Sequence, residues 1–360
     1  MPIQSHIETI LSPRLCAEDE AAFRIFTSRS RFAAYQQSLA WANHAPSGGR
    51  QDLLLFLCRR RGETISAGVV RRTKLAPFTF LATLQRGPVV AELDDLGLVL
   101  KALKRALREA GCCSVIVGPR ARGEERDRAL ATLSQAGFSA LPNSAQSLHV
   151  STGLIDLRPS EDAILAGFKQ RGRRQIRAAA GKGVGIRSAE TEADIAAYDT
   201  VTAEFMAGKP AYGRKGQPDA RGQAAIVGAN GGGILLAELD SEVIGGHAFV
   251  VQGNEAIWLS IATSNRDPSL PRSYLLVWEA MRMAKRLGCQ AYDLAGMVGS
   301  DARDRGEVNR EQFKQAFAPS LEDLVPAHVA ALDPVRHAIL FNARQAYRRF
   351  RAGRAARPRG

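Results

Sequence analysis

The sequence predicts a mixed α/β (α+β) protein of two similar domains, produced by duplication of one unit. With 360 residues, the chain is longer than one ordinary domain. Residues 53–70 and 233–251 each hold two apolar runs around a polar turn, a pattern typical of a β-hairpin. Each is followed by apolar residues at helical spacing, a glycine–cysteine pair and a strand, in residues 98–117 and 275–294.

Glycine positions support the duplication. Gly68 and Gly245 are 177 residues apart, and Gly111 and Gly288 are separated by the same number. A glycine directly after a helix commonly forms the left-handed cap. We therefore expect the two units to superpose with Gly68 over Gly245 and Gly111 over Gly288.

The predicted organisation has three parts. Residues 1–150 form the first domain, and residues 151–330 form the second domain, which opens with a basic linker helix. Residues 331–360 form a C-terminal amphipathic helix, expected from about Pro334 to Phe350, and an arginine-rich tail.

The positive charge lies in two blocks. The formal net charge is +13, of which residues 169–187 and 344–360 contribute +7 each, which leaves −1 on the rest. Localised positive charge indicates an anionic partner, such as nucleic acid, a phosphate or an anionic membrane surface. We expect the tail to make peripheral contact with such a membrane. The alternative is a solvated helix face and a disordered tail.

The cysteine and hydropathy patterns favour a cytoplasmic protein, or one peripheral at the inner face of the membrane. Five cysteines show no metal-ligand spacing, and an odd number in a long chain is typical of reduced thiols. No apolar run has the length of a signal peptide or of a membrane span. No zinc-ligand, P-loop or serine-hydrolase pattern is present, so we predict no metal site.

Four stretches resemble the FemABX family of non-ribosomal peptidyl transferases. Residues 155–184 resemble the family's central segment, a short strand, an acidic helix start, an RR-x-IR-x-A block and a Gly-Val turn. Residues 311–319 contain an FK-xx-F core, and residues 35–41 and 85–90 resemble first-domain segments. The matching residues are Arg173, Arg174, Ile176, Arg177, Ala179, Val184, Phe313, Lys314 and Phe317.

The resemblance covers residues 30–320 and implies two tandem acetyltransferase (GNAT)-like domains. Family members move an amino acid from aminoacyl-tRNA to an amine, typically on the peptide stem of a peptidoglycan precursor. The implied partners are aminoacyl-tRNA and an anionic cell-wall precursor, with no cofactor besides the tRNA co-substrate. This sequence has no lysine directly after Trp41, where the run is Ala42-Asn43-His44, and it has no coiled-coil segment. Both differences leave the identity of the acceptor and of the donor open.

Lys314 and Asp293 are the candidate catalytic residues. Aminolysis of an ester needs a cation or a hydrogen-bond donor at the oxyanion, and the resemblance gives Lys314 this role. The alternative is that Phe313 and Phe317 are core residues and Lys314 extends beside them. Asp293 ends a predicted strand, where it could orient the amine, accept a proton or only cap a turn.

The candidate binding residues fall into two groups. Lys209, Tyr212 and Arg214 lie in a Gly/Pro loop suited to phosphate, and with Tyr292 they are expected to bind substrate. The resemblance places Arg214 at the precursor's phosphate, whereas a solvated loop is the alternative. The second group is the i, i+4 row that is expected to bind tRNA or another anion, namely Lys169, Arg173 and Arg177.

The basic segment is also expected to pack against the rest of the protein. Phe168, Ile176 and Ala180 should form the buried stripe of the linker helix. Arg174 lies off the cationic row, where it could turn inward to pair with Asp156 or Asp293.

Two other function classes stay open. The first is an acyl-CoA-dependent N-acyltransferase that acts on a cell-envelope or polysaccharide amine. The corresponding pyrophosphate loop, residues 264–276, holds Pro268 and Pro271 and no glycine, which argues against CoA. The second class is a non-enzymatic nucleic-acid binder that uses the two basic blocks.

Overall fold

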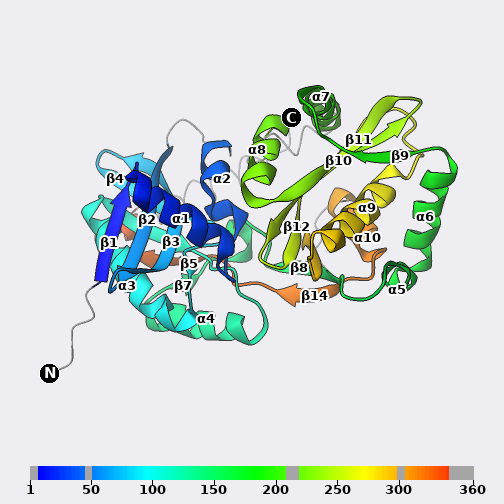
Figure 1. Cartoon of the computed structure of the whole chain (residues 1–360). Helices are drawn as coiled ribbons and strands as arrows, with labels where there is room; N and C mark the ends of the chain where they lie inside the picture. The colour runs from blue at the N-terminus through cyan, green and yellow to red at the C-terminus, as the bar shows by residue number, and fades with distance from the viewer. Residues whose placement is uncertain (1–6, 45–50, 208–218, 298–304, 340–360) are drawn as a thin grey trace, which may run out of the picture.

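The protein consists of two mixed β-sheets that lie side by side, each with helices on both faces (Figure 1). This computed structural model describes residues 7–44, 51–207, 219–297 and 305–339. The predicted α/β class and the division into two sheet-centred units are confirmed.

The N-terminal half of the chain supplies most of the first sheet. Its long helix α3 is strongly amphipathic, and a stripe of leucines with Val99 and Ala102 is buried. The elements are β1 (Ile7–Ser12), α1 (Ala17–Arg29), η1 (Tyr35–Gln37), α2 (Leu39–His44), β2 (Gln51–Arg60), β3 (Glu63–Ala76), β4 (Thr79–Leu84), β5 (Val89–Val90), η2 (Leu93–Asp95), α3 (Leu96–Glu109), β6 (Cys112–Val117), α4 (Gly123–Gln135), β7 (Ser139–Ala140) and η3 (Asn143–Ala145).

The C-terminal half supplies most of the second sheet. None of the helices in the described ranges is long and apolar enough to span a bilayer. The elements are β8 (Ser151–Asp156), α5 (Glu161–Gly167), α6 (Gln170–Gly181), β9 (Gly185–Ser188), α7 (Glu192–Ala207), α8 (Ala220–Asn230), β10 (Gly232–Leu239), β11 (Glu242–Gln252), β12 (Glu255–Thr263), α9 (Arg272–Arg286), β13 (Ala291–Gly296), α10 (Arg305–Gln315), β14 (Ser320–Asp323) and β15 (His328–Ala331).

The two sheets repeat one strand order. The first sheet runs β1-β2-β3-β4-β6-β15-β7, with β5 beside β3, and the second runs β9-β10-β11-β12-β13-β8-β14. In each sheet an antiparallel run leads into one parallel pair, β4 with β6 and β12 with β13, joined by the helices α3 and α9. The duplication is therefore visible in topology as well as in sequence.

The hairpins agree with the prediction, but one pair of anchors is shifted. Both hairpins turn through two residues with positive φ, at Arg61–Gly62 and Asp240–Ser241, as tight hairpins require. Both hairpins also have a β-bulge, which lies two residue pairs away from the turn. When the bulges are aligned, Gly245 corresponds to Ser66 and not to Gly68. The predicted superposition of Gly68 on Gly245 is wrong by two residues, because the spacing between hairpin and helix differs between the units.

The second pair of anchors holds. Gly111 follows α3 with φ of 76°, and Gly288 follows α9 with φ of 86°. Both glycines therefore form the left-handed caps that end the crossover helix before a parallel strand.

The strand that follows each repeat in the chain lies in the sheet of the other repeat. The strand β8 follows the first unit, yet it pairs with β13 and β14 in the second sheet. The strand β15 follows the second unit, yet it pairs with β6 and β7 in the first sheet. Residues 328–330 thus belong to the first sheet, although the sequence places them at the end of the second domain, because a short apolar strand does not encode its partner.

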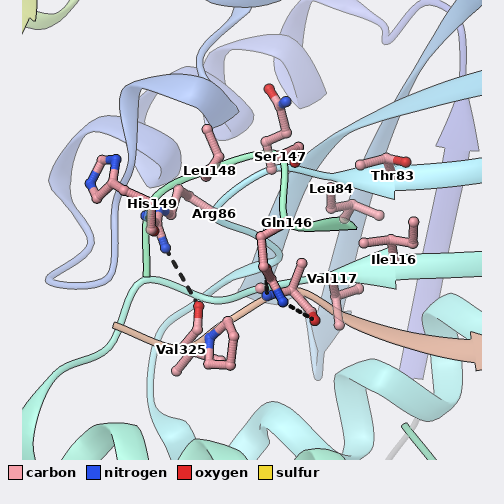
Figure 2. A pocket seen from close by; sticks show the side chains of 14 residues that line it. Thr83, Leu84, Arg86, Ile116, Val117, Gln146, Ser147, Leu148, His149 and Val325 are labelled. Atoms are coloured by element: carbon pink, nitrogen blue, oxygen red, sulfur yellow. Dashed lines mark hydrogen bonds between the residues drawn. The ribbon is translucent and has the colours of Figure 1, made fainter. Parts of the chain in front are cut away.

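The two segments that cross between the sheets are bonded to each other. We call residues 146–151 and 324–327 the crossing segments. The Leu324 N–H donates to the Val150 carbonyl over 2.8 Å, and the Ala327 N–H donates to Gln146 Oε1 over 2.7 Å. The buried Arg86 guanidinium donates to the carbonyls of His149 and Val325, one on each crossing segment. Figure 2 shows Arg86 and Gln146 directed toward this crossing.

The cores follow from this arrangement. One face of the first sheet packs on α3 and α4, and the other face packs on α1 around Phe23. The second sheet packs on α6 and α9 around Phe168 and Trp278, and on α7 and α8 around Tyr198. Trp41 of α2 belongs to that last core, so the first half contributes an anchor to the second.

The described part of the C-terminal segment begins as predicted. Residues 334–339 are helical, which agrees with a helix that starts at Pro334. The rest of the predicted helix and the arginine-rich tail lie outside the described residues.

A cavity mutation beside β15 tests whether the exchange couples the two halves. Leu332 is 5% exposed and packs in the first core, so Leu332→Ala should destabilise that core by about 2–5 kcal/mol. All three tryptophans pack in the cores of the second sheet. We expect their fluorescence transition in urea to shift to lower concentration together with the far-ultraviolet dichroism.

The matched control is Leu321→Ala in β14, where the side chain is 55% exposed and little should change. A tryptophan transition unaffected by Leu332→Ala would show that the halves unfold independently.

Candidate active site

The parallel strands of the second sheet separate where those of the first do not. The strands β12 and β13 pair only from Glu255 to Ile257, opposite Ala291 to Asp293. In the first sheet, β4 and β6 stay paired along the whole length of β4 after Thr79. The divergence follows from β13, which shifts register after Asp293 and takes a positive φ of 58° at Ala295. The second sheet is therefore open between two parallel strands.

Lys314 reaches this opening from the last turn of α10. Its ammonium donates to the carbonyl of Gly296 over 2.7 Å and lies 5.4 Å from the centre of the Trp258 ring. Burial lowers the pKa of Lys314 to about 8, although the charge of Asp293 acts in the opposite direction. The FK-xx-F motif therefore has a structural and a polar part. Phe317 is buried in the hydrophobic core, whereas the ammonium of Lys314 is directed toward the end of β13.

Asp293 lies on β13 and is held rigidly. It is 4% exposed, and its Oδ1 accepts hydrogen bonds from the Thr152 hydroxyl and, over 2.7 Å, from the Ala295 N–H. Thr152 belongs to β8, the strand that follows the first repeat in the chain. The exchange thus positions one candidate catalytic carboxylate.

The first half adds three ionisable groups to the same region. Burial lowers the pKa of Arg86 to about 10, and the nearby charge of Asp293 opposes this shift. Enclosure by the protein raises the pKa of Tyr35 to about 12, with Arg86 and Asp293 among the charges that act on it. Burial and the charge of Arg86 lower the pKa of His149 to about 3, so this imidazole is neutral at physiological pH.

The sequence did not assign a role to Arg86, Tyr35 or His149. Two of them lay in stretches that resemble the family, Arg86 in residues 85–90 and Tyr35 in residues 35–41. The available indication for Arg86 was its place beside a Gly-Pro turn, where a charged side chain is easily taken for a solvated one. Only the fold shows that this turn is covered by the two crossing segments.

A small, partly open pocket lies at the crossing. It is lined by the ends of β4 and β6 and by both crossing segments, with Arg86 and His149 on its wall (Figure 2). His149 also packs on Gly296, because a methyl group on Gly296 would lie 2.8 Å from His149 Cβ. The pocket in the first half is therefore separated from the Lys314 site by one packed contact.

Tyr292 is placed differently from the prediction. Its side chain is fully buried, and its hydroxyl bonds to His247 Nε2 inside the second sheet. Alternation along β13 explains this position, because neighbouring residues of a strand face opposite sides and Asp293 takes the side of the opening. Tyr292 is thus a core residue. The other three predicted substrate residues, Lys209, Tyr212 and Arg214, lie outside the described residues.

The basic segment forms two helices and not one. The chain bends at Phe168 and Lys169 between α5 and α6, where the carbonyl of Ala316 approaches Gly172 so closely that no side chain would fit. The bend shifts the buried stripe, which contains Phe168, Ile176 and Ala179, whereas the predicted Ala180 is exposed.

The cations of this segment divide by role. Arg173 caps α5, because its guanidinium donates to the carbonyls of Ala166 and Phe168. Lys169 and Arg177 are exposed, as expected for residues that face solvent or an anion. Arg174 is also exposed, so the predicted inward pairing is wrong; Asp156 pairs instead with its neighbour Arg158.

Comparisons with known proteins agree with this architecture. The family model described as the FemAB family matches residues 19–207, and a model described as an acetyltransferase (GNAT) domain matches residues 166–315. A search of curated protein sequences finds no match.

Several solved structures share the fold. A crystal structure of FemX has a TM-score of 0.73 at 14% identity, covering 92% of this chain and 100% of that one. L-PGS from Bacillus licheniformis has a TM-score of 0.52 at 15% identity, covering 81% of this chain and 88% of that one. A tandem GNAT protein from the clavulanic acid biosynthesis pathway has a TM-score of 0.51 at 13% identity, covering 91% and 99%.

The likeness to these structures establishes two tandem GNAT-like domains. The FemAB model covers more than half of the chain and includes the crossing strand β8 and the basic helices. The protein is an acyl- or aminoacyltransferase, and the chain belongs to the FemAB family.

Proposed function

We propose that the protein transfers an amino acid from aminoacyl-tRNA to an amine of a cell-envelope precursor, the peptide stem of a peptidoglycan precursor. Membership of the FemAB family supports the reaction class. The observation that carries the proposal is the position of Lys314, a desolvated cation between separated parallel strands beside the fixed carboxylate of Asp293. Such a reaction takes place where charged tRNA is present, in the cytoplasm or at the inner face of the membrane.

The chemistry requires little more than position and charge. The amine nitrogen attacks the ester carbonyl, a C–N bond forms, the C–O bond to the tRNA ribose breaks, and the proton lost by the amine ends on the leaving hydroxyl. Lys314 can hold the oxyanion, because a fixed cation in a desolvated site stabilises charge that develops in the transition state. One of its three N–H groups is occupied by Gly296, which fixes the direction of the others.

Asp293 is suited to hold the attacking amine. A buried carboxylate fixed by Thr152 and Ala295 keeps one position, so an amine bonded to it is oriented before reaction. No cofactor enters this scheme, in which aminoacyl-tRNA is the co-substrate. Lys169 and Arg177 are the proposed contacts for its phosphates, because Lys169 is exposed at the start of α6 and Arg177 is exposed on it.

An acyl-CoA donor is the second candidate, favoured by the match of residues 166–315 to a GNAT model. In this chain α9 starts after Pro271, which has no N–H to offer a pyrophosphate. The buried Arg272 donates to the carbonyls of Ser264 and Arg266 and so ties the preceding loop to the helix. These features favour the aminoacyl-tRNA donor.

Product analysis distinguishes the two donors. The protein is incubated with charged tRNA or with acetyl-CoA, together with UDP-N-acetylmuramyl pentapeptide, and the acceptor is weighed by mass spectrometry. We expect an increase of one amino-acid residue with charged tRNA. An acetyl increment with acetyl-CoA alone would support the second candidate, and no increment with either donor would reject this acceptor.

Substitution of Lys314 tests the oxyanion role through its pH dependence. Loss of one such group lowers the rate by about 10² to 10³ in Lys314→Ala. Because burial lowers the pKa of Lys314 to about 8, the stabilising ammonium is present below this pH and is lost as pH rises through it. Single-turnover rates in the wild type should therefore decline above pH 8.

Lys314→Arg is the matched control, because its side chain stays charged across this range. Its rate should not show the decline, whatever its absolute value. A decline centred on the same pH in both variants would assign the titration to another group and contradict the role given to Lys314.

A further inference from the structure

Exposed apolar side chains gather at one end of the first unit. Eight large apolar residues are exposed in the described part of the chain, and four of them lie here, namely Leu75, Phe78, Val335 and Ile339. The first two lie at the turn between β3 and β4, and the other two lie in the helix at residues 334–339. A group of exposed apolar side chains commonly marks an interaction site.

Three contacts join the segments that carry these side chains. Arg336 Nη1 donates to the carbonyl of Phe78 over 3.5 Å. A methyl group on Gly111, which follows α3, would lie 3.8 Å from the same carbonyl. Arg108 of α3 donates from Nε to the carbonyl of Leu332 over 3.1 Å. The β3–β4 turn, the end of α3 and the C-terminal helix therefore form one continuous surface.

Phe78 occupies a position that internal packing does not explain. Its side chain is 84% exposed, and its φ is 53°. Pro77 precedes it, and a proline followed by a residue with positive φ is the pattern of a type II turn, in which glycine or asparagine is usual at the second position. A bulky residue at such a φ is strained. The turn thus holds an aromatic ring in solvent at a conformational cost.

The short C-terminal helix also directs apolar side chains outward. His337 faces the first sheet, since its Nδ1 bonds to the hydroxyl of the buried Ser114 over 2.8 Å. Val335 and Ile339 are four residues apart, so they share one face of the helix, and this face is opposite to His337. Their exposed fractions of 69% and 62% agree with this position. The apolar face of this helix therefore points away from the core.

Cations lie beside the apolar group. Lys101, Arg105 and Arg108 form an exposed row on α3, in which the only acidic residue is Glu109. Lys74 is exposed near the end of β3. The surface therefore combines exposed apolar side chains with an excess of positive charge.

The sequence adds further positive charge where the described chain ends. Residue 339 is the last that the structure describes, and residues 340–360 contain seven arginines and no acidic residue. Two nearby ion pairs, Arg72 with Asp52 and Arg336 with Asp333, are neutral and leave this balance unchanged. An anionic partner is favoured, and a second copy of this chain is disfavoured, because two like-charged surfaces would meet.

We propose that this end of the first unit docks on the surface of an anionic lipid bilayer. We call it the docking face; Phe78, Val335 and Ile339 enter the interfacial layer, and the α3 cations contact lipid phosphates. A bilayer surface offers both an apolar layer and negative charge. An RNA would bind the cations but would leave the aliphatic side chains exposed. The docking face adds described residues to the tail contact predicted from the sequence, and it does not depend on the proposed reaction.

Phe78→Asn tests the apolar part of the docking face without straining the turn. Asparagine adopts a positive φ more readily than phenylalanine, so the variant should remain folded. The matched control is Leu287→Asn, which removes a leucine that is 51% exposed at the end of α9 in the second unit.

A double substitution on α3 tests the charged part. Lys101→Ala with Arg105→Ala removes two exposed cations from the docking face. The control, Arg171→Ala with Arg174→Ala, removes the same charge from exposed positions of α6 in the second unit. Thermal unfolding followed by circular dichroism checks that all four variants are folded.

Binding is measured by sedimentation of the full-length protein with two kinds of vesicle, an equal mixture of phosphatidylglycerol and phosphatidylcholine, and phosphatidylcholine alone. We expect the wild type to bind the anionic vesicles and to bind them more weakly as salt is added. Phe78→Asn should bind about tenfold more weakly, because one aromatic side chain no longer leaves water. The Lys101/Arg105 variant should also lose about tenfold or more. Both controls should keep the wild-type affinity.

Each result decides the proposal. Weaker binding by both test variants, with both controls unchanged, upholds the docking face. Unchanged binding by either test variant, equal losses in the controls, equal binding to the neutral vesicles or no binding by the wild type overturns it. Self-association that is lost in Phe78→Asn, or binding of an RNA hairpin without binding of vesicles, would assign the surface to another partner and also overturn it. Because no substrate is present, failure of this test leaves the proposed function intact, and absence of amino-acid transfer leaves the docking face intact.

Discussion

The exchange of one strand between the two sheets is the constraint on which the rest of the molecule depends. Neither sheet is complete without the strand that follows the other repeat in the chain, since β15 separates β6 from β7 and β8 separates β13 from β14. The two crossing segments are bonded to each other, and Arg86 donates to both. A buried guanidinium that loses its hydrogen bonds is costly, so the contacts of Arg86 with the two segments stabilise both the arginine and the crossing.

This constraint also determines where the chemistry takes place. Thr152, which fixes Asp293, lies on the exchanged strand β8, and Gly296, which accepts from Lys314, packs on His149 of a crossing segment. Lys314 and Asp293 both belong to the second half, but contacts from both halves orient them. The first sheet keeps its parallel strands paired and so offers no equivalent opening. Duplication has produced two similar units, of which one presents the reactive groups and the other positions them.

Local features of this protein were predictable from the sequence, and long-range ones were not. The hairpins, the caps at Gly111 and Gly288 and the position of Lys314 depend on neighbours in the chain, so pattern and resemblance were sufficient. The domain boundary at residue 151 placed β8 with the second sheet, but the position of β15 in the first sheet was not predictable, because a strand of four residues fits either sheet equally well. For Tyr292 and Ala180 the predicted face of the strand or helix was wrong by one residue, since Asp293 and Ala179 take the predicted places. Arg86 was missed because the burial of a charged side chain depends on tertiary contacts.

Native-state hydrogen exchange of β8 and β15 tests the central claim most directly. If the exchange of strands couples the halves, the amides of β8 and β15 should open with the same free energy as those of β6 and β13, and only through global unfolding. Their exchange rates should then share one dependence on denaturant. Opening of β8 or β15 at a clearly lower free energy, while β6 and β13 remain protected, would show that the sheets do not depend on the exchanged strands and would contradict this account.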